Sequence, residues 1–416
     1  MGRAEQAIGA DRHGIGDSTR SNKFESLECL RGIAAIAVFF CHFFVSFVPL
    51  VMGPRWFRTE IGSGPYLYGS LFFGPLNGHF AVAIFFVLSS YVLTYKILEG
   101  GPRSLVWIGI IKRIPRLSLL TLIGCVLPFL LLKAGLMAND QVAALNGSNW
   151  LGNSGGVSQN DSYGSASLFR AVMDGTIMVF FGQTQFNSAF WTMKFEFLGS
   201  IFAFLSAGAL VSRWPKIVSW GVVCLLAAFA ARIHGLCAIC VVTVCLAHVY
   251  DPRYFKINGS VAFILIVVGL VLGSFFAPVG AWSFSALADL PPPYSELAKW
   301  AILGVGATLV FAAVRWSPLR DIMTGRGARF LGAISYPFYA IHVPLIGSMA
   351  CLIYLHDFTV TGVVLASVAT LLTILGIARI LAVVDQAWVS KVNLAADKIS
   401  KLVSSNSSEA GRLVPR

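Results

Sequence analysis

The amino-acid sequence predicts an all-α integral membrane protein, a bundle of about ten transmembrane helices with both chain ends in the cytoplasm. The first observation is composition: of 416 residues, 56% are hydrophobic and 12% are charged, whereas an average soluble protein has about 25% charged residues. The second is length, because apolar runs of about 20 residues, enough to cross a hydrocarbon core, recur along the chain. The third is the distribution of charge, because most Lys and Arg residues lie at the chain ends and in every second segment that connects these apolar runs.

Ten segments have the length and composition of a span: about 30–50, 78–98, 115–136, 190–211, 217–232, 234–250, 260–278, 298–314, 334–355 and 360–384. The fifth and sixth are separated only by residues 232–234, a corner that is also compatible with a re-entrant turn. We expect a cytoplasmic tail over 1–28, a membrane domain over 29–385 and a cytoplasmic tail over 386–416. The polar start of the chain shows no cleavable signal-peptide pattern, so the first apolar run is expected to stay as a membrane anchor.

An even number of spans puts both chain ends on one side of the membrane. If that side is the cytoplasm, most of the 31 Lys and Arg residues fall in inside segments, as the positive-inside rule requires. The net charge of +12 is therefore attributed to topology and not to nucleic-acid binding. The longest outside segment, 137–189, is rich in Gly, Ser and Asn and is expected to be an exposed loop over the mouth of the bundle.

The eight cysteines lie within or at the ends of apolar stretches, where thiols behave as small hydrophobic groups. A disulfide framework is not expected. Cys237 and Cys240 have CxxC spacing, but no second pair stands at the spacing of a zinc site. We therefore expect no metal site and no bound cofactor.

Arg31 and His42 are the most informative polar residues of the first span. Eleven steps of about 100° place both on one helix face, about 16.5 Å apart along the axis. This puts Arg31 near the cytoplasmic boundary and His42 near mid-membrane. Imidazole is suited to general-base catalysis on a hydroxyl, and guanidinium holds phosphate or carboxylate through its forked donors. The alternative is structural: a histidine bonded to a carbonyl, and an arginine that snorkels to the interface.

Two further clusters carry charge into the predicted spans. The third span opens with KRIPR, in which Arg113 and Arg116 share a face at i,i+3, as either an anion site or a positive-inside flank. In the fourth span, WTMKFEF places Glu196 five residues after Trp191. A carboxylate there needs a partner, either Lys194 or an arginine or histidine of another span. A purely structural ion pair is the alternative.

The second and ninth spans also contain polar groups. The ninth, SYPFYAIHVPL, contains Tyr336 and His342 in a helix interrupted by two prolines. In the second, Ser89 is one of several small residues that allow neighbouring helices to approach closely. His79 is expected to lie at the outer boundary as an interfacial residue.

Taken in order, these motifs resemble the membrane acyltransferase family 3, the integral-membrane O-acyltransferases that include O-antigen and exopolysaccharide acetylases. The resemblance covers about residues 24–385. It rests on LRGIAAIAVFFCH, with ten residues between the basic residue and the histidine, and on GHFAVAIFFVLSSYVL, KRIPRL, WTMKFEF and LGAISYPFYAIHVPLI. Two departures occur: serine replaces the usual glycine after FFVLS, and the closing acidic-x-Pro pattern is reduced to Asp385-Gln386-Ala387.

The resemblance implies transfer of an acyl group, usually acetyl from acetyl-CoA, to a hydroxyl of a saccharide or glycolipid, polysaccharide and lipopolysaccharide among them. By position, His42 would be the catalytic histidine, and Glu196 would occupy a further motif position. We expect Glu196, as a second catalytic residue, or another buried acid to orient His42, which would either deprotonate the acceptor hydroxyl or be acylated transiently itself. The basic residues that handle acetyl-CoA would be Arg31, Arg113 and Arg116. Further motif positions without an assigned role are Trp191, Ser89, Tyr336 and His342. The expected location is a cell membrane, in the first instance the bacterial inner membrane.

Two other functions compete with this one. A proton-coupled transporter would use His42, Glu196 and His342 as a relay without covalent chemistry. It predicts repeat symmetry between the chain halves, which the sequence does not show. A non-catalytic membrane scaffold would have no use for two histidines and a glutamate inside helices.

Overall fold

The structure is a computed structural model that describes residues 4–53, 67, 70–155, 167–250, 256–275, 287 and 290–410, with side chains from Phe24 to Lys398 apart from Leu71. Within these residues the regular secondary structure is helical throughout. The all-α prediction is confirmed.

Eight helices of the described chain are long and apolar enough to cross a membrane. They are α1 (Ala4–Phe47, with its apolar part from Phe24), α3 (Gly78–Leu98), α4 (Ser104–Lys133), α8 (Met193–Leu210, preceded by the 3-10 turn η5, Ser188–Thr192), α9 (Lys216–Ile233), α13 (Tyr294–Trp316), α15 (Arg326–Leu345, continued by the π turn η6, Ile346–Ala350, and α16, Cys351–His356) and α17 (Val360–Ala410).

Two further apolar helices, α10 (Gly235–Val249) and α11 (Gly259–Gly273), have 15 residues each. At 1.5 Å per residue each is about 22 Å long, shorter than a hydrocarbon core of about 30 Å. The corner between α9 and α10 falls at His234, whose Nδ1 accepts a hydrogen bond from the backbone N–H of Leu236 and caps α10. Each of the ten predicted segments contains a helix within the described residues, while the number of membrane crossings stays a prediction.

Two boundaries differ from the sequence prediction. Helix α4 begins at Ser104, so the KRIPR motif lies inside the helix and does not open it. Pro115 is accommodated there as an interior residue. Helix α17 continues without a break to Ala410, well beyond the predicted end of the membrane domain at 385.

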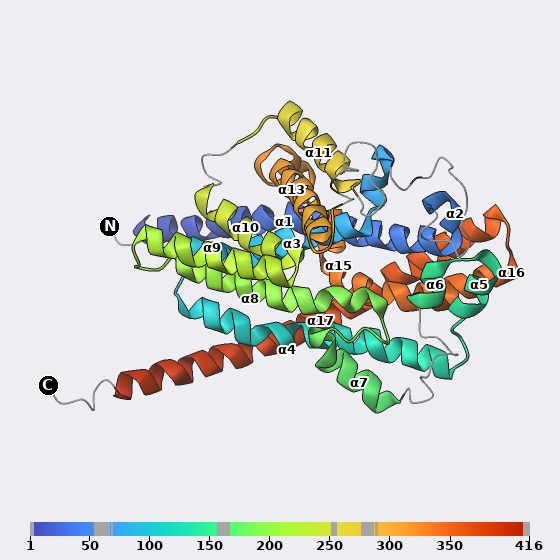
Figure 1. Ribbon diagram of the computed structural model, residues 1–416. Helices are drawn as coiled ribbons and strands as arrows, with labels where there is room; N and C mark the ends of the chain where they lie inside the picture. Colours follow the sequence, from blue (N-terminus) through green and yellow to red (C-terminus); the bar gives the residue numbers. More distant parts are fainter. Residues whose placement is uncertain are drawn as a thin grey trace.

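Helices α1, α4, α8, α9 and α17 extend along one long direction, and α11 and α13 cross it steeply (Figure 1). The start of α1 and the end of α17 lie at the same end of the bundle. The opposite end carries α16 and three short helices, α2 (Pro49–Met52), α5 (Asn139–Asn146) and α6 (Asn149–Asn153). Both ends of the described chain therefore lie on one side of the bundle.

The segment 137–189 was predicted as an exposed loop, and this prediction is wrong for the part that is described. It contains α5, α6, α7 (Leu168–Thr176) and the 3-10 turn η4 (Met178–Phe181), while residues 156–166 lie outside the described chain. Its Gly, Ser and Asn residues end and begin helices: Gly147 closes α5 with a φ of 72°, and the Ser148 hydroxyl caps α6. A composition typical of loops is also typical of closely spaced caps.

Helix α1 is the centre of the bundle and packs along α15 and α3. Helix α15 in turn packs against α4 and α17, and α3 packs against α8, α10 and α13. The interior between α1 and α15 is aromatic, with Phe39 and Phe43 fully buried and Phe39 in edge contact with Phe338 at 6.1 Å between ring centroids. These contacts fix how α1 and α15 present their polar side chains to each other.

Asn187 links α4 to α15 by hydrogen bonds to one backbone carbonyl of each helix. Pro128 and Pro344 lack an N–H, so the carbonyls of Gly124 and Ala340, four residues earlier, lose their helical donors. The Asn187 side-chain amide donates to both carbonyls, at 3.1 Å and 2.8 Å. A Cβ on Gly124 would lie 2.7 Å from the Ala340 oxygen, so this approach requires glycine. Asn187 thereby fixes the start of η5, which carries Trp191 and Thr192.

Candidate active site

His42 of α1 and His342 of α15 are hydrogen-bonded in the interior of the bundle. Nδ1 of His42 is 2.9 Å from Nε2 of His342, and the two rings are within 4° of parallel. Nδ1 of His342 is 2.8 Å from the carbonyl oxygen of Tyr339. Because a carbonyl only accepts, His342 carries its hydrogen on Nδ1, and the Nε2 of the neutral ring accepts from Nδ1–H of His42. Nε2 of His42 is then the unprotonated nitrogen.

A cavity of about 210 Å³ borders His42, and we call it the His42 cavity. Trp150 forms part of its wall and stacks on His42, with ring centroids 4.7 Å apart and 14° between the planes. Trp150 belongs to α6, which is held to α1 because the Ser148 hydroxyl donates to the Val45 carbonyl at 2.7 Å. The segment between α4 and η5 therefore supplies a wall of the cavity, and sequence reasoning did not single out Trp150.

Trp191 and His79 also border the His42 cavity. Their rings are 5.9 Å apart, and both lie near Trp300 of α13, at 6.1 Å and 5.6 Å. His79 was expected to be an interfacial residue at the outer boundary, and this stays a prediction. It lies in the first turn of α3, where its backbone N–H donates to the capping Asn77, and it borders the His42 cavity. The cavity wall is thus aromatic, with hydrogen-bonding groups from Asn77 and Ser188.

A second cavity, of about 610 Å³, lies between α1, α3, α4, α8, α15 and α17. We call it the arginine cavity, because it is bordered by four arginines and three carboxylates: Arg31, Arg113, Arg116, Arg329, Glu28, Glu196 and Asp385. Ser89 and Tyr336 border it as well. The three arginines that the sequence predicted as donor-handling residues therefore meet in one place, although they come from two different helices.

Glu196 pairs with Arg113 across the arginine cavity, with Oε1 of Glu196 2.6 Å from Nη2 of Arg113. An arginine of another span was one of the partners the sequence allowed. The pair is shielded from solvent, since the exposed fractions of the two side chains are 15% and 6%. The structure does not bring Glu196 to His42, whose hydrogen-bonded partner is His342; the expectation that Glu196 orients His42 is therefore wrong.

Two guanidinium groups keep unused donors in the arginine cavity. The Nε atoms of Arg31 and Arg113 are buried and have no hydrogen-bond partner among the described residues. Among the described residues, the ion-pair partner of Arg31 is Glu28, and the distance from Nη2 of Arg31 to Oε1 of Glu28 is a long 3.7 Å. Buried donors without partners are costly.

Tyr336 sits beside these arginines and is held by a backbone contact. Its hydroxyl donates to the carbonyl oxygen of Leu117, one residue after Arg116, at 2.9 Å. This bond ties α15 to the turn of α4 that carries Arg113 and Arg116. Asp385 and Gln386, which occupy the reduced closing motif, also border the arginine cavity. The motif position thus faces the same cavity although its proline is absent.

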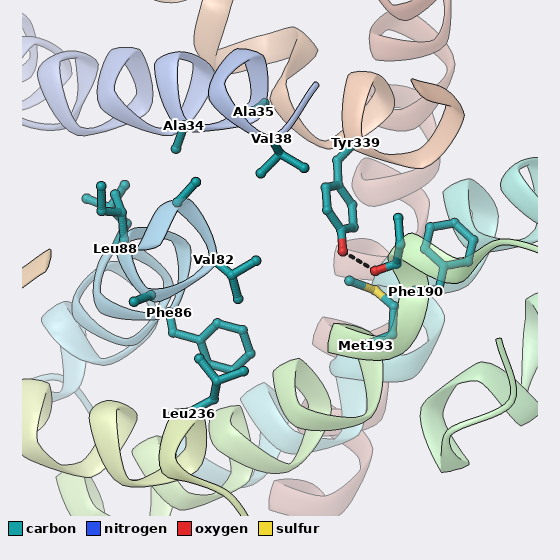
Figure 2. Packing of buried hydrophobic residues seen from close by; sticks show 14 of the residues in the cluster. Ala34, Ala35, Val38, Val82, Phe86, Leu88, Phe190, Met193, Leu236 and Tyr339 are labelled. Atoms are coloured by element: carbon teal, nitrogen blue, oxygen red, sulfur yellow. Dashed lines mark hydrogen bonds between the residues drawn. The ribbon is translucent and has the colours of Figure 1, made fainter. Parts of the chain in front are cut away.

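The arginine cavity and the His42 cavity adjoin each other at Val82 of α3 and Tyr339 of α15, which border both. Figure 2 shows the two side chains reaching toward the same interior space from facing helices. The Tyr339 hydroxyl donates to the carbonyl of Ala189, and the hydroxyls of Tyr339 and Thr192 are 2.8 Å apart. The predicted site residues therefore divide between two adjacent cavities, and His342 contacts His42 from α15.

Within the described residues, no group of three His, Cys, Asp or Glu side chains is arranged to hold a metal ion. The eight cysteines are free thiols. The reactive side chains that border the two cavities carry imidazole, guanidinium, carboxylate, hydroxyl and thiol groups.

The chain was compared with protein-family models, with curated proteins and with solved structures. The family model of the acyltransferase domain, Acyl_transf_3, matches residues 24–381. No curated protein and no solved structure matches. The matched range begins at the apolar part of α1 and ends within α17. It contains the cavity-bordering residues of every helix except α17, whose cavity-bordering residues, among them Asp385 and Gln386, follow the end of the match.

Proposed function

Because the chain belongs to the acyltransferase family 3, and is thereby a membrane acyltransferase, we propose that it moves an acetyl group from acetyl-CoA to a hydroxyl of a cell-surface saccharide or glycolipid. The observation that carries the proposal is the adjacency of two cavities of different chemistry. One is bordered by four arginines, and the other is bordered by a histidine whose Nε2 is unprotonated.

The arginine cavity suits the donor. Its volume of about 610 Å³ is within the usual range of ligand pockets, about 300–1,000 Å³. Guanidinium groups bind phosphate through paired, charge-assisted hydrogen bonds. Arg31 also lies about 16.5 Å closer than His42 to the end of the bundle where the chain ends meet. The charge bias assigns that end to the cytoplasm, where acetyl-CoA is made available.

The His42 cavity suits the acceptor hydroxyl. In the proposed step Nε2 of His42 takes the proton of the hydroxyl while its oxygen attacks the thioester carbonyl carbon. The new C–O bond forms, the C–S bond breaks, and the thiolate leaves with the proton that His42 returns. His342 accepts from Nδ1–H of His42 throughout, and so stabilises the tautomer that leaves Nε2 free. The histidine ends the cycle in its starting protonation state.

The aromatic wall supports a saccharide as the acceptor. Trp150 and Trp191 present large apolar faces. The Ser188 hydroxyl, which donates to the Ser154 carbonyl at 2.6 Å, keeps its oxygen as an acceptor, and Nε2 of His42 is a second acceptor. Sugars expose both kinds of surface, apolar C–H faces and hydroxyls. The resemblance to O-antigen and exopolysaccharide acetylases supports the same class of acceptor, and with it a location in the bacterial inner membrane.

The test is acetyl transfer from labelled acetyl-CoA in membranes containing the intact chain, with saccharide and glycolipid fractions as acceptors. We expect label in one of these fractions, and its loss in His42→Ala. A matched control is His356→Ala, since His356 is exposed at the end of α16 and borders neither cavity. Label that persists in His42→Ala would remove the histidine from the mechanism, and a protein that binds no CoA would favour a transporter.

A further inference from the structure

We propose that Val82 and Tyr339 form the passage through which the acyl group moves from the arginine cavity to the His42 cavity, and that this passage restricts the donor to short, uncharged acyl groups. The inference rests on the proposed function and adds the acyl specificity of the site.

The two cavities place the reacting groups on opposite sides of this pair. The arginines border one cavity and His42 the other, and Val82 and Tyr339 border both. A thioester whose phosphates contact the arginines must therefore extend its acyl end between Val82 and Tyr339 to come within reach of His42. Both side chains are largely enclosed, with exposed fractions of 6% and 7%, so an acyl group between them would be surrounded by protein.

The side chains of Val82 and Tyr339 are both restricted in their movement. Val82 is β-branched and lies within α3, where one χ1 rotamer is strongly preferred. The Tyr339 hydroxyl is held by the Ala189 carbonyl and by Thr192. Its ring contacts the rings of Phe85 and Phe190 at centroid distances of 6.2 Å and 6.4 Å. The phenol is thus fixed at both its hydroxyl and its ring.

The backbone of Tyr339 adds a second constraint. Its carbonyl accepts the Nδ1–H of His342, which in turn accepts from His42. A displacement of this turn of α15 to admit a longer chain would disturb the hydrogen bonds that orient His42. The walls that an acyl chain meets are valine methyls and a phenol ring, which favour an uncharged group over a carboxylate such as that of succinyl.

The experiment compares acetyl-CoA, butyryl-CoA and succinyl-CoA as donors for the full-length protein, with kcat/KM measured for each in the same preparation. Each added methylene in a confined apolar pocket typically changes discrimination about 10- to 200-fold. We expect wild type to prefer acetyl over butyryl by at least about tenfold, and Val82→Ala to lose most of that preference. Val82→Ile, one methylene larger, is expected to lower acetyl transfer as well.

Val87→Ala is the matched control, because Val87 lies on α3, is fully buried and borders neither cavity. It removes the same two methyl groups and should leave the acetyl-to-butyryl ratio unchanged. The ratio does not depend on how much protein is folded, so a destabilised variant still gives an answer. Unchanged ratios in both Val82 variants, or equal use of the donors by wild type, would overturn the passage alone. Absence of transfer from every donor would overturn the proposed function and the passage with it.

Discussion

Nδ1 of His42 lies 2.9 Å from Nε2 of His342, and the second nitrogen of His342 lies 2.8 Å from the Tyr339 carbonyl. A backbone carbonyl therefore fixes the tautomers of both rings. In serine hydrolases a carboxylate performs this task for the catalytic histidine. Here an uncharged imidazole does so, which avoids a second buried charge inside the membrane.

The first prediction concerns His342 as a positioning residue. Replacing it by Leu removes the acceptor for Nδ1–H of His42, so kcat should fall about 10²- to 10⁴-fold, the range for losing a correctly oriented general base. The KM for acetyl-CoA should change little, because His342 does not border the arginine cavity. Steady-state transfer assays on purified protein give both constants.

Rescue separates positioning from simple packing. In His342→Gln the side-chain oxygen can replace Nε2 as the acceptor, and we expect activity within about tenfold of wild type. Both variants should elute as folded protein in size-exclusion chromatography. Equal loss in the Leu and Gln variants, with both folded, would show that His342 acts through packing and not as an acceptor.

The second prediction concerns donor binding by Arg113. Its guanidinium is 6% exposed, is paired with Glu196 and has a buried Nε without a partner among the described residues. Arg113→Ala should raise the KM for acetyl-CoA about 10- to 100-fold, corresponding to one lost charge-assisted contact of about 1.5–3 kcal/mol. The KM for the acceptor should stay within about twofold, because the acceptor binds in the other cavity.

Lys112→Ala is the control for Arg113. Lys112 is the preceding residue of the same helix and also carries a positive charge, but it is half-buried, its Nζ donates to Oδ1 of Asn393 at 3.3 Å, and it does not border the arginine cavity. It should leave both KM values unchanged. Equal effects of the two substitutions would show that Arg113 contributes only to the charge of the helix flank.

The polar pattern within single helices is the part of the site that the sequence predicted. The eleven-residue spacing placed Arg31 and His42 on one face of α1, and both border interior cavities. The partners of these residues could not be predicted from the sequence. His42 and His342 are 300 residues apart in the chain, and their contact depends on how α1 packs against α15. For the same reason the sequence left the partner of Glu196 open until the structure showed Arg113.

Residues outside the periodic segments were harder to predict. Trp150 stands in a Gly- and Asn-rich stretch with no apolar periodicity, so nothing in the pattern indicated that it stacks on His42. The hydrogen bonds of Asn187 were not predicted either, although the sequence does indicate that a donor is needed. Pro128 and Pro344 each free a carbonyl inside a span, and two such carbonyls need donors from another segment. The sequence alone does not reveal which donor serves them.

The third prediction concerns the stability contributed by Asn187. Asn187→Asp keeps the size of the side chain, but it removes both N–H donors and places a carboxylate against the carbonyls of Gly124 and Ala340. Each unsatisfied buried acceptor costs about 1–3 kcal/mol, so we expect a clear fall in Tm in detergent. The control is Asn393→Asp, because Asn393 is exposed and its Oδ1 already accepts from Lys112. An unchanged Tm in Asn187→Asp would show that these carbonyls find other donors.

The last prediction decides the role of Glu196. As a second catalytic residue, the role expected for it from the sequence, it would contribute about 10²- to 10⁴-fold to kcat. The structure instead pairs it with Arg113 in the arginine cavity, away from His42. Glu196→Gln keeps an oxygen to accept from Arg113 and removes one negative charge beside the proposed phosphate contacts. We therefore expect kcat within about tenfold of wild type and an equal or lower KM for acetyl-CoA, because one repulsive charge is gone. A loss of kcat greater than about 10²-fold at unchanged KM would restore Glu196 to the catalytic step, and would require the α8 carboxylate to reach the reacting groups through the passage between Val82 and Tyr339.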